Sequence, residues 1–526
     1  MKLRTACLAL LVLVAGCRGE TSCPRCDTLI VAATGEPSSL LPPLVVETVG
    51  RDISDQIYER LADLAPGGAP VDTGAFRPRL AARWERVDSV TWRFHLRTGA
   101  RWQDGQPVTA RDVVFSFEAF TDSLLDSPAA GELRGHLRAE AEGDQAVLVH
   151  FDRAYPEQLY DATYHVRVFP AHVWDGVPRE RWGDDTATRH IVGSGPYRLE
   201  SWQRGQALTL VADTGTGPRP QLHRAVWRFA SDPEAALNLV LSGEADLMES
   251  VGSPERVARV EQDSALRAVR YPSAAFGFLG YRIQGHPLLA DRALRRALNQ
   301  AADRSTIATA VFGPGALAPP GPMSKLLWIW DDGIAVLPYD TAAAARALDA
   351  AGYRRGADGV RRKGGRTLAF DILVPSTSTG RRRLAEALQE QWRLAGAQVT
   401  VTAVDFPVFM ERLHRGAFDS YIGAWLDEPS ARVIPDQWGR AGLGSDNYGG
   451  YLNPVVERLF AQAMAEASPA AARAAWKTAL DSLNADAPAL FLYTPVQVAA
   501  VSRRVEHLAI DPYSWLSALP QVTLTR

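Results

Sequence analysis

The stretch from Thr91 to Phe120 constrains the fold most, because a strand, a turn and a capped helix follow one another within it. Apolar and polar residues alternate over 91–97, which is the period of a half-buried strand. An Asp-Gly pair then forms a turn, since glycine adopts positive φ without steric cost. Thr109 and Asp112 have the spacing of a capping box, ahead of apolar residues at helical spacing. We predict a structural unit here rather than a ligand contact.

The first residues of the chain resemble an export signal. A short basic start precedes an apolar run over 8–15, which is too short for the roughly 20 residues that span a bilayer. The sequence VAGC, ending at Cys17, resembles a bacterial lipobox. We predict a signal peptide over 1–16 and a lipid anchor at Cys17, which would attach the mature chain to a membrane. The alternative is an ordinary signal in which this cysteine has no role.

Cys23 and Cys26 lie in a short tether, residues 17–26, ahead of the body of the chain. Three interpretations are open: a small disulfide loop, a pair of free thiols, or half of a metal site. An oxidising compartment outside the cytoplasm favours the disulfide. A zinc site would need a second pair of Cys or His residues beside this one, and the sequence offers none.

Length and charge limit the class of protein. A chain of 526 residues exceeds what one hydrophobic core usually serves, so two or three domains are expected. The formal net charge of −3 predicts no nucleic-acid partner, because phosphate binding needs clustered positive charge. Beyond the signal, no stretch of the sequence is apolar enough to span a membrane.

No sequence motif indicates catalysis. There is no GxSxG elbow and no HExxH, and the ten histidines are dispersed. His172 is expected to be a surface or hydrogen-bonded histidine. The glycines within 191–202 are not a phosphate loop, because no Lys follows in the P-loop register. We therefore predict a protein that is not an enzyme and uses no metal or other cofactor.

Two further segments make structural predictions. Strand, helix and strand patterns over 367–404 predict a parallel crossover unit. An arginine-rich helix is expected within 287–304. Its apolar face is separate from most of its arginines, so a solvated face is predicted for Arg292, Arg295 and Arg296.

Several segments, in order, resemble the dipeptide/oligopeptide-binding family of extracytoplasmic solute-binding proteins that serve ABC importers. The first is LRTGARWQDGQPVTARDVVFSFE, within the stretch described above. The others are IVGSGPYRLESW at 191–202, GEADL at 243–247, the arginine-rich helix, YLNPVV at 451–456 and DAPALFLY at 486–493. The resemblance covers nearly the whole chain beyond the signal.

This resemblance implies a bilobed α/β fold of the periplasmic-binding-protein type II class, with an additional domain and a ligand cleft between the lobes. The lobes are expected to close around the ligand by a hinge motion. By resemblance, lobe I combines 27–55, 190–272 and 489–526, the additional domain covers 56–189, and lobe II covers 273–488. The stretch that begins at Thr91 would then lie in the additional domain.

Peptide-binding relatives clamp the amino terminus of the peptide with an aspartate that follows a tryptophan in a W-x-x-D segment. Trp425 matches that tryptophan, but the segment up to Pro429 is shorter by at least one residue. Asp427 is either the amine-binding aspartate or the separate acid that precedes the family's proline. A carboxylate suits the role, because a buried ammonium needs a charged partner. The alternative is a structural acid at a strand end.

On lobe I, the resemblance places Glu47, Thr48 and Val49 where relatives offer extended backbone to the peptide. A helix is predicted to follow at 52–61, where apolar residues recur on one face.

Together these features predict a monomeric, lipid-anchored receptor outside the cytoplasm, which captures a peptide or similar small solute for the permease of an ABC importer. The alternative from another class is an anchored interaction or signalling lipoprotein with a degenerate cleft, which the shortened segment after Trp425 would support. Scattering profiles that no ligand changes would favour that alternative. An enzyme is the third possibility, and loss of turnover on changing one cleft residue would reveal it.

Overall fold

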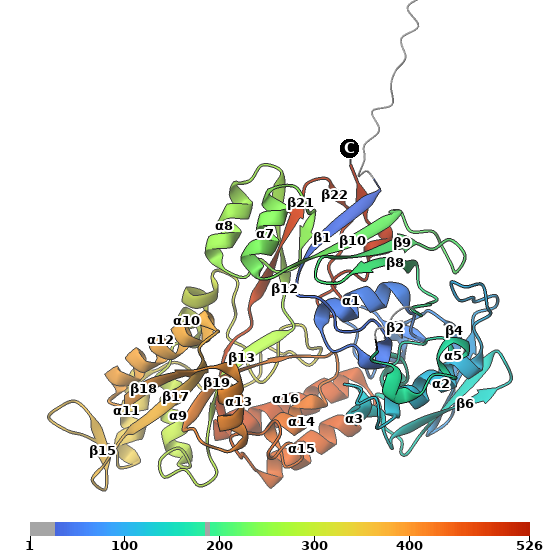
Figure 1. Cartoon of the computed structure of the whole chain (residues 1–526). Coiled ribbons are helices and arrows are strands. Elements are labelled where there is room, and N and C mark those ends of the chain that lie inside the picture. Colours follow the sequence, from blue (N-terminus) through green and yellow to red (C-terminus); the bar gives the residue numbers. More distant parts are fainter. Residues whose placement is uncertain (1–26, 185–189, 526) are drawn as a thin grey trace, which may run out of the picture.

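The structure is a computed structural model that describes residues 27–184 and 190–525. The predicted signal peptide, Cys17, Cys23 and Cys26 therefore lie outside the described residues. The protein has three parts, each built around one larger sheet (Figure 1). A seven-stranded sheet forms lobe I, a five-stranded sheet forms lobe II, and a four-stranded sheet forms the additional domain.

The sheet of lobe I has the order β12-β21-β11-β1-β10-β9-β8. Its central strand, β1, is parallel to β10 and β11, and the other neighbours are antiparallel. Helix α1 packs against β8, and α7 packs against β1. The bounds are β1 Thr28–Thr34, α1 Thr48–Ile57, β8 Tyr197–Gln203, β9 Ala207–Ala212, β10 Arg224–Ala230, α7 Pro233–Leu241, β11 Leu247–Met248, α8 Pro254–Gln262, β12 Leu266–Pro272 and β21 Val496–Ser502.

The additional domain contains an antiparallel sheet of order β4-β5-β7-β6, with α2 packed against it. The predicted strand and capped helix are confirmed as β5 and α2, and both capping-box hydrogen bonds form between Thr109 and Asp112. The bounds are β2 Ala62–Leu64, β3 Phe76–Pro78, β4 Ala81–Asp88, β5 Thr91–Leu96, α2 Ala110–Thr121, α3 Ala130–Leu133, β6 Leu137–Glu142, β7 Ala146–Phe151, α4 Gln158–Thr163 and α5 Ala171–Trp174.

The sheet of lobe II has the order β18-β17-β19-β13-β20. The predicted crossover unit is confirmed, because β17 and β18 pair in parallel and α12 connects them. The bounds are β13 Ala275–Tyr281, α9 Arg292–Gln300, α10 Arg304–Phe312, α11 Thr341–Ala350, β17 Ala369–Pro375, α12 Thr379–Ala395, β18 Gln398–Val404, α13 Phe406–His414, β19 Ser420–Leu426, α14 Val433–Trp438, α15 Pro454–Ala465, α16 Pro469–Asp486 and β20 Ala489–Tyr493. A small sheet, β14 Arg354–Arg355, β15 Arg361–Lys363 and β16 Arg366–Thr367, extends from it (Figure 1).

The hydrophobic cores show which parts belong together. One continuous cluster joins side chains of the lobe I sheet, such as Val31 and Trp227, to side chains of the additional domain, such as Phe94 and Trp182. Lobe II has two large clusters, which contain Leu279 and Phe278 respectively, and the second also includes Val71 at the border with the additional domain. Lobe I and the additional domain therefore form one packed unit, and lobe II forms another.

The chain passes between these two units at two places, after β12 and after β20. The range 489–526 expected for lobe I thus includes one strand, β20, that pairs with β13 of lobe II. The two connections lie side by side, with Ser273 Oγ and Gln497 Nε2 3.5 Å apart. Short paired connections of this kind are where a hinge motion between two lobes is absorbed.

The prediction of a solvated arginine face is wrong for Arg295. This side chain is only 3% exposed, and its guanidinium donates to the backbone oxygens of Ala487 and Asp486, each at 2.9 Å. Arg292 and Arg296 also donate to a backbone oxygen, that of Ala485. The three arginines converge on the C-terminal end of α16, where unpaired carbonyls and the helix dipole favour positive charge.

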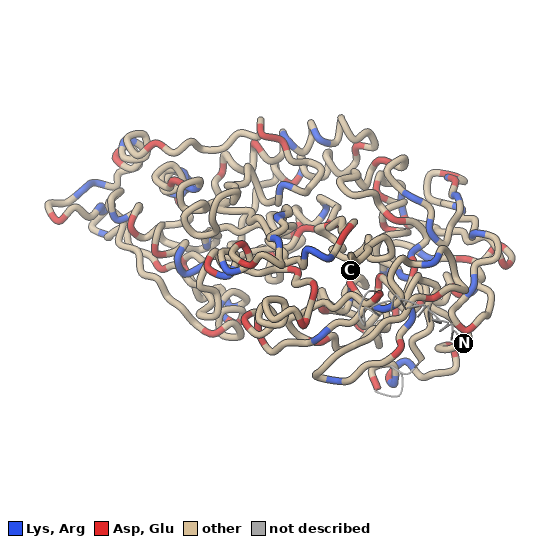
Figure 2. Tube along the Cα trace, turned by 90° about the horizontal axis from the view of Figure 1, so that it is seen from above, with Lys and Arg blue, Asp and Glu red and all other residues tan. Residues whose placement is uncertain are grey.

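The surface carries both charges throughout. Lys and Arg lie among Asp and Glu along the trace (Figure 2). His172 is confirmed as a surface histidine, with Nε2 2.6 Å from Asp104 Oδ2. Within residues 27–184 and 190–525, no helix combines the length and apolar character that crossing a membrane requires. The same residues contain no group of three or more His, Cys, Asp or Glu that could hold a metal ion.

We predict that Asp112→Ala destabilises the additional domain by about 2 to 4 kcal/mol. The change removes a helix cap, and it also leaves the Ala171 N–H, which donates to Asp112 Oδ1 at 2.9 Å, without a partner. Urea unfolding followed by tryptophan fluorescence measures the loss. Glu118→Ala on the exposed face of the same helix is the control, and equal effects of the two changes would contradict the prediction.

Candidate functional site

A cleft of about 370 Å³ lies where lobe I, lobe II and the additional domain meet. Lobe I contributes the segment around the start of α1 and one residue near the C-terminus. Lobe II contributes the end of β19 and α14. The lining residues are Pro42, Val45, Val46, Arg51, Asp55, Arg60, Phe120, Ser127, Pro128, Ala129, Tyr164, His165, Arg167, Trp425, Leu426, Glu428, Val433, Asp436, Gln437, Asp446 and Tyr513.

Both lobes present apolar side chains that the protein leaves uncovered. Val46 of lobe I is 58% exposed and Leu426 of lobe II is 65% exposed, although both line the cleft. Trp425, the tryptophan singled out from the sequence, is half-buried beside Leu426 in the lobe II wall. Uncovered apolar side chains on facing lobes of a concave site are typical of ligand contact.

The cleft also contains two charged groups that form no direct ion pair among the described residues, although the charge of Arg51 acts on Glu249, where it opposes the rise in pKa that burial causes. Among the described residues, no acidic side chain forms an ion pair with Arg51, whose guanidinium reaches only Thr48 Oγ1 at 3.5 Å. Likewise, the carboxylate of Glu428 has no hydrogen-bond or ion-pair partner within the part of the chain that the structure describes. A guanidinium on lobe I and a carboxylate on lobe II can together hold a ligand that carries both charges.

Buried polar atoms without partners lie around the same cleft. Gln437 Oε1 and Tyr513 OH have no hydrogen-bond partner among the described residues, and both residues line the cleft. Buried polar atoms in folded proteins are nearly always hydrogen-bonded. These two atoms are therefore available to a ligand or to water.

Asp427 lies behind the wall rather than in it, and it does not line the cleft. It is 5% exposed, and its Oδ2 accepts from the Ser324 N–H at 2.5 Å. Its Oδ1 has no partner among the described residues. Burial raises the pKa of Asp427 to about 7, against the weaker lowering effect of the Ser324 hydrogen bonds. Sequence patterns did not distinguish Glu428 from its neighbour, yet of the two it is Glu428 that lines the cleft, together with Asp55, Asp436 and Asp446.

The expectation of extended backbone is wrong for Thr48 and Val49, because α1 begins at Thr48 instead of near residue 52. Glu47 is the extended residue before the helix, and its Oε2 accepts from Ser38 Oγ at 3.2 Å. None of these three residues lines the cleft. Val45 and Val46, the two residues directly before Glu47, do line it.

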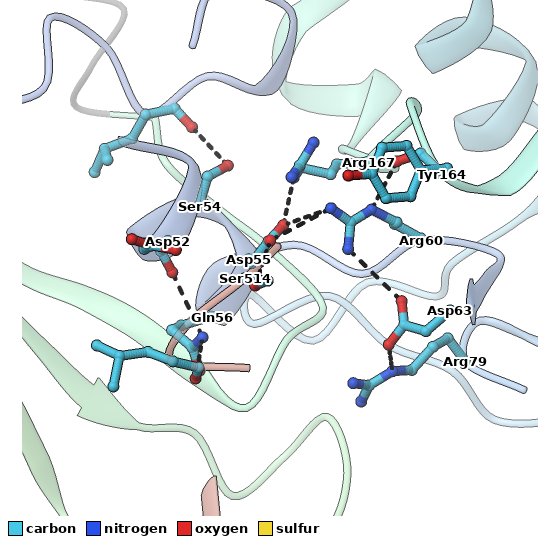
Figure 3. Close-up of polar contacts among 12 residues, drawn as sticks. Asp52, Ser54, Asp55, Gln56, Arg60, Asp63, Arg79, Tyr164, Arg167 and Ser514 are labelled. Atoms are coloured by element: carbon cyan, nitrogen blue, oxygen red, sulfur yellow. Dashed lines mark hydrogen bonds and ion pairs between the residues drawn. The ribbon is translucent and has the colours of Figure 1, made fainter. Parts of the chain in front are cut away.

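The carboxylate of Asp55, one of the residues that line the cleft, lies at the centre of a group of polar contacts (Figure 3). It pairs with Arg60 at 3.2 Å and Arg167 at 2.5 Å, and it accepts from Ser514 Oγ at 3.1 Å. Burial alone would raise the pKa of Asp55, but Arg167 and Arg60 outweigh it and lower the pKa to about 2. Arg60 in turn donates to the backbone oxygen of Tyr164 at 2.8 Å. These charges are therefore paired within the protein rather than free for a ligand.

A second ion-pair cluster connects lobe II to the additional domain. Arg432, just before α14, donates through Nε to Glu157 Oε2 at 2.8 Å and also pairs with Asp161. Ser430 of lobe II donates to Glu157 Oε2 at 2.5 Å, and Tyr155 donates to Asp161 Oδ2 at 2.6 Å. The two carboxylates are almost fully buried. We call Arg432, Ser430, Glu157, Asp161 and Tyr155 the interdomain cluster.

Over residues 75–438, the sequence matches the bacterial extracellular solute-binding proteins, family 5 (middle region). The protein belongs to this family. Membership confirms the resemblance of the motifs, the extracytoplasmic location and the expectation of a binding protein rather than an enzyme.

Individual relatives cover most of the chain. Protein XP55 of Streptomyces lividans is 28% identical over 470 residues, which are 89% of this chain and 83% of that protein. The dipeptide-binding protein of Escherichia coli is 23% identical over 518 residues, covering 93% of each chain. The family-5 member described here therefore spans nearly the whole length of both relatives.

Solved structures confirm the bilobed type II fold. The oligopeptide-binding protein AppA of Bacillus subtilis, in complex with a nonapeptide, aligns with a TM-score of 0.75 and 22% identity over 95% of this chain and 99% of that one. The substrate-binding protein CtaP of Listeria monocytogenes aligns with a TM-score of 0.82 and 21% identity over 95% and 99%. At these identities the likeness establishes the fold alone.

We predict that Asp427→Asn changes the pH dependence of stability in the family-5 protein. The folded-state pKa of about 7 lies above the unfolded value of about 3.9, so the folded state holds the proton more tightly. The contribution of Asp427 to stability is therefore full below pH 4 and is lost as the pH rises towards 7. The free energy of unfolding of the variant, minus that of the parent, should increase by roughly 2 to 3 kcal/mol between pH 5 and pH 8.

Chemical denaturation at several pH values measures that difference without ligand. Other titrating groups are present in both proteins, so their contributions cancel in the comparison. A constant difference between pH 5 and pH 8 would show that Asp427 has an ordinary pKa.

Proposed function

We propose that the protein is a lipid-anchored, monomeric receptor that captures a peptide or similar small solute and delivers it to the permease of an ABC importer. The observation that carries the proposal is that Arg51 and Glu428, which form no direct ion pair among the described residues, line one cleft from opposite lobes. A peptide with free termini carries the complementary charges. The anchor at Cys17 and the disulfide between Cys23 and Cys26 belong to the proposal on sequence grounds.

The relatives support a peptide as the ligand. One is named a dipeptide-binding protein, and the AppA structure contains a nonapeptide. The apolar side chains of Val46, Trp425 and Leu426 suit the side chains of such a ligand. A cleft lined in this way also weakens the alternative of a degenerate cleft in an interaction protein.

In this proposal Glu428 binds the ligand's ammonium group, and the carboxylate of the ligand pairs with Arg51. Asp427, the candidate predicted from the sequence, remains the alternative partner of the ammonium group, since its buried Oδ1 has no hydrogen-bond partner among the described residues. Glu47, with extended backbone beside the valines of the cleft, is proposed to contribute backbone contacts. The lobes close by rotation at the two connections, and closure removes the ligand from water.

We predict that peptides with free amino termini stabilise the protein and that Glu428→Gln weakens their binding about tenfold or more, because a charge-assisted hydrogen bond is lost. Thermal-shift screening against peptides, sugars, opines and nickel chelates identifies the ligand class. Calorimetry with a tripeptide and its N-acetylated form then measures the ammonium contribution.

Two variants sharpen that experiment. Asp427→Asn should leave the affinity nearly unchanged, and a larger loss here than at Glu428 would transfer the ammonium role to Asp427. Glu118→Gln, on the exposed face of α2, is the matched control. If no solute in the screen stabilised the protein, the transport function would be contradicted.

We also predict that Arg432→Gln accelerates ligand dissociation and weakens affinity tenfold or more. The change leaves the buried carboxylates of Glu157 and Asp161 uncompensated, and breaking such a pair costs on the order of 3–5 kcal/mol. Because the interdomain cluster joins lobe II to the additional domain, that cost is paid only when the lobes are together. Stopped-flow dissociation and small-angle scattering measure the two effects.

Arg228→Gln, which removes an exposed ion pair with Glu244 on lobe I, is the control for the loss of an arginine. Unchanged dissociation in Arg432→Gln would show that the interdomain cluster has no role in closure.

A further inference from the structure

Strand β18 forms one edge of the lobe II sheet, and no other described strand pairs with its outer side. It packs against β17 and α12. None of its seven residues, Gln398–Val404, is fully buried, and none lines the cleft. A strand at the edge of a sheet presents backbone N–H and C=O groups that can pair with another chain.

The composition of β18 differs from that of the other edge strands. Exposed edges in natural proteins usually carry charged residues or proline, which discourage pairing with a second chain. The outer strands of lobe I and of the additional domain follow this rule, with Arg and Glu in β8, β4 and β6, and Arg and Pro in β12. The opposite edge of the lobe II sheet, β20, is buried throughout. In contrast, β18 has the sequence QVTVTAV, without charge or proline.

Alternate residues of β18 direct their backbone groups towards β17. Gln398 donates through its N–H to the Leu368 oxygen at 2.9 Å, and the N–H of Ser376 donates to the Val404 oxygen at 2.7 Å. In a parallel ladder, every second residue of a strand bonds to the same neighbour. The even-numbered residues of 398–404 therefore face β17, and the odd-numbered residues face outwards.

The outward residues are Val399, Val401 and Ala403, which are centred on Val401. Gln389 of α12 uses one of their acceptors, because its Nε2 donates to the Val399 oxygen at 2.7 Å. A carbonyl oxygen has two lone pairs, so it can accept from a second donor as well. An antiparallel copy of the strand, centred on the same residue, would place a donor opposite an acceptor at every outward position.

The segments on either side of β18 add apolar surface. Leu394, in the last turn of α12, is 63% exposed, and Phe406 and Val408 at the start of α13 are 49% and 44% exposed. Antiparallel pairing brings the start of one strand to the end of the other, so Leu394 of one copy lies at the same end as Phe406 and Val408 of the other copy. A strand pair alone is small beside the roughly 1,200–2,000 Å² that stable interfaces bury, and these side chains add to it.

The same register brings opposite charges together at each end. Arg355 lies beside the start of the strand, because its Nη2 donates to the Leu394 oxygen at 2.9 Å. Asp405 directly follows the strand. Neither side chain forms a direct ion pair among the described residues, although Arg355 adds to the effect of Arg361, which lowers the pKa of Asp349. Arg355 of one copy and Asp405 of the other are therefore complementary.

We propose that two copies of the protein pair through β18, antiparallel about a two-fold axis at Val401, so that their lobe II sheets join. The outward backbone groups, the uncharged strand and the matching ends favour a second copy over an unrelated strand. This inference goes beyond the proposed function, because the cleft takes no part and each copy binds its solute by itself. The contact is small, so dilute protein is monomeric and pairs form where anchored copies are crowded.

Sedimentation velocity of the full chain without ligand, over a wide range of concentrations, tests the inference. The average mass of the parent protein should rise towards that of a dimer, and amide hydrogen exchange within 398–404 should slow over the same range. Thr400→Lys brings like charges close together across the axis and should weaken pairing about tenfold or more. Ala403→Pro removes an outward N–H and keeps the bonds to β17, so it should weaken pairing by a similar factor.

Thr478→Lys is the matched control, because this threonine is exposed on α16, outside β18. Thermal unfolding shows whether each variant is folded, and either variant alone suffices for the comparison. A parent protein that stays monomeric at every concentration overturns the inference, and so does association that Thr400→Lys and Ala403→Pro leave unchanged. No ligand is present in this experiment, so pairing would stand even if the solute screen contradicted the transport function.

Discussion

One buried carboxylate, that of Asp55, joins three segments that are far apart in the sequence. Helix α1 supplies the acid, the additional domain supplies Arg167, and the C-terminal segment supplies Ser514. Removing Asp55 would leave two arginines, Arg60 and Arg167, without this buried carboxylate, so the acid holds the three segments together as a unit. The continuous hydrophobic cluster of lobe I and the additional domain has the same consequence. Relative movement is therefore left to lobe II.

This division explains why the polar groups of the site fall into two classes. Side chains that lie within the unit of lobe I and the additional domain, such as Asp55 and Arg60, form ion pairs with one another. Arg51 and Glu428 belong to different units and form no direct ion pair with any residue that the structure describes. Unpaired charges on two bodies that move towards each other are stabilised only when something between them is complementary to both. In the proposed function, binding and closure are thereby coupled.

Local sequence patterns predicted the parts of the fold that local physics determines. The capped helix from Ala110 and the crossover around α12 follow from capping and periodicity, and both are confirmed. The motif GSGPY was also recognised in the sequence. The structure explains why its first residue is glycine, because a Cβ at Gly193 would lie 1.9 Å from the Ile57 backbone oxygen. The long-range contacts of individual side chains were harder to predict. Arg295 turned to the end of a helix almost 200 residues away, which no periodicity within its own helix could reveal.

The choice between Asp427 and Glu428 shows the same limit at the site. Adjacent residues of an extended segment point in opposite directions, so one faces the cleft and the other faces the interior. Which of the two residues faces the cleft depends on the register in which β19 pairs with β13, and that register is a property of the whole sheet. The sequence could indicate an acid after Trp425, but it could not say which of the two would meet the ligand.

The two connections between the lobes limit the direction in which the lobes can approach each other. Strands β12 and β21 pair up to Pro272 and Val496, and β13 and β20 pair again from Gly277 and Tyr493. The two crossings are thus fastened to each other at both ends, like a short two-stranded strap. A strap of this kind bends easily but resists shear and separation of its strands. In the proposed closure, bending of this strap is therefore the easiest movement for lobe II, and the cleft opens on the side away from the strap.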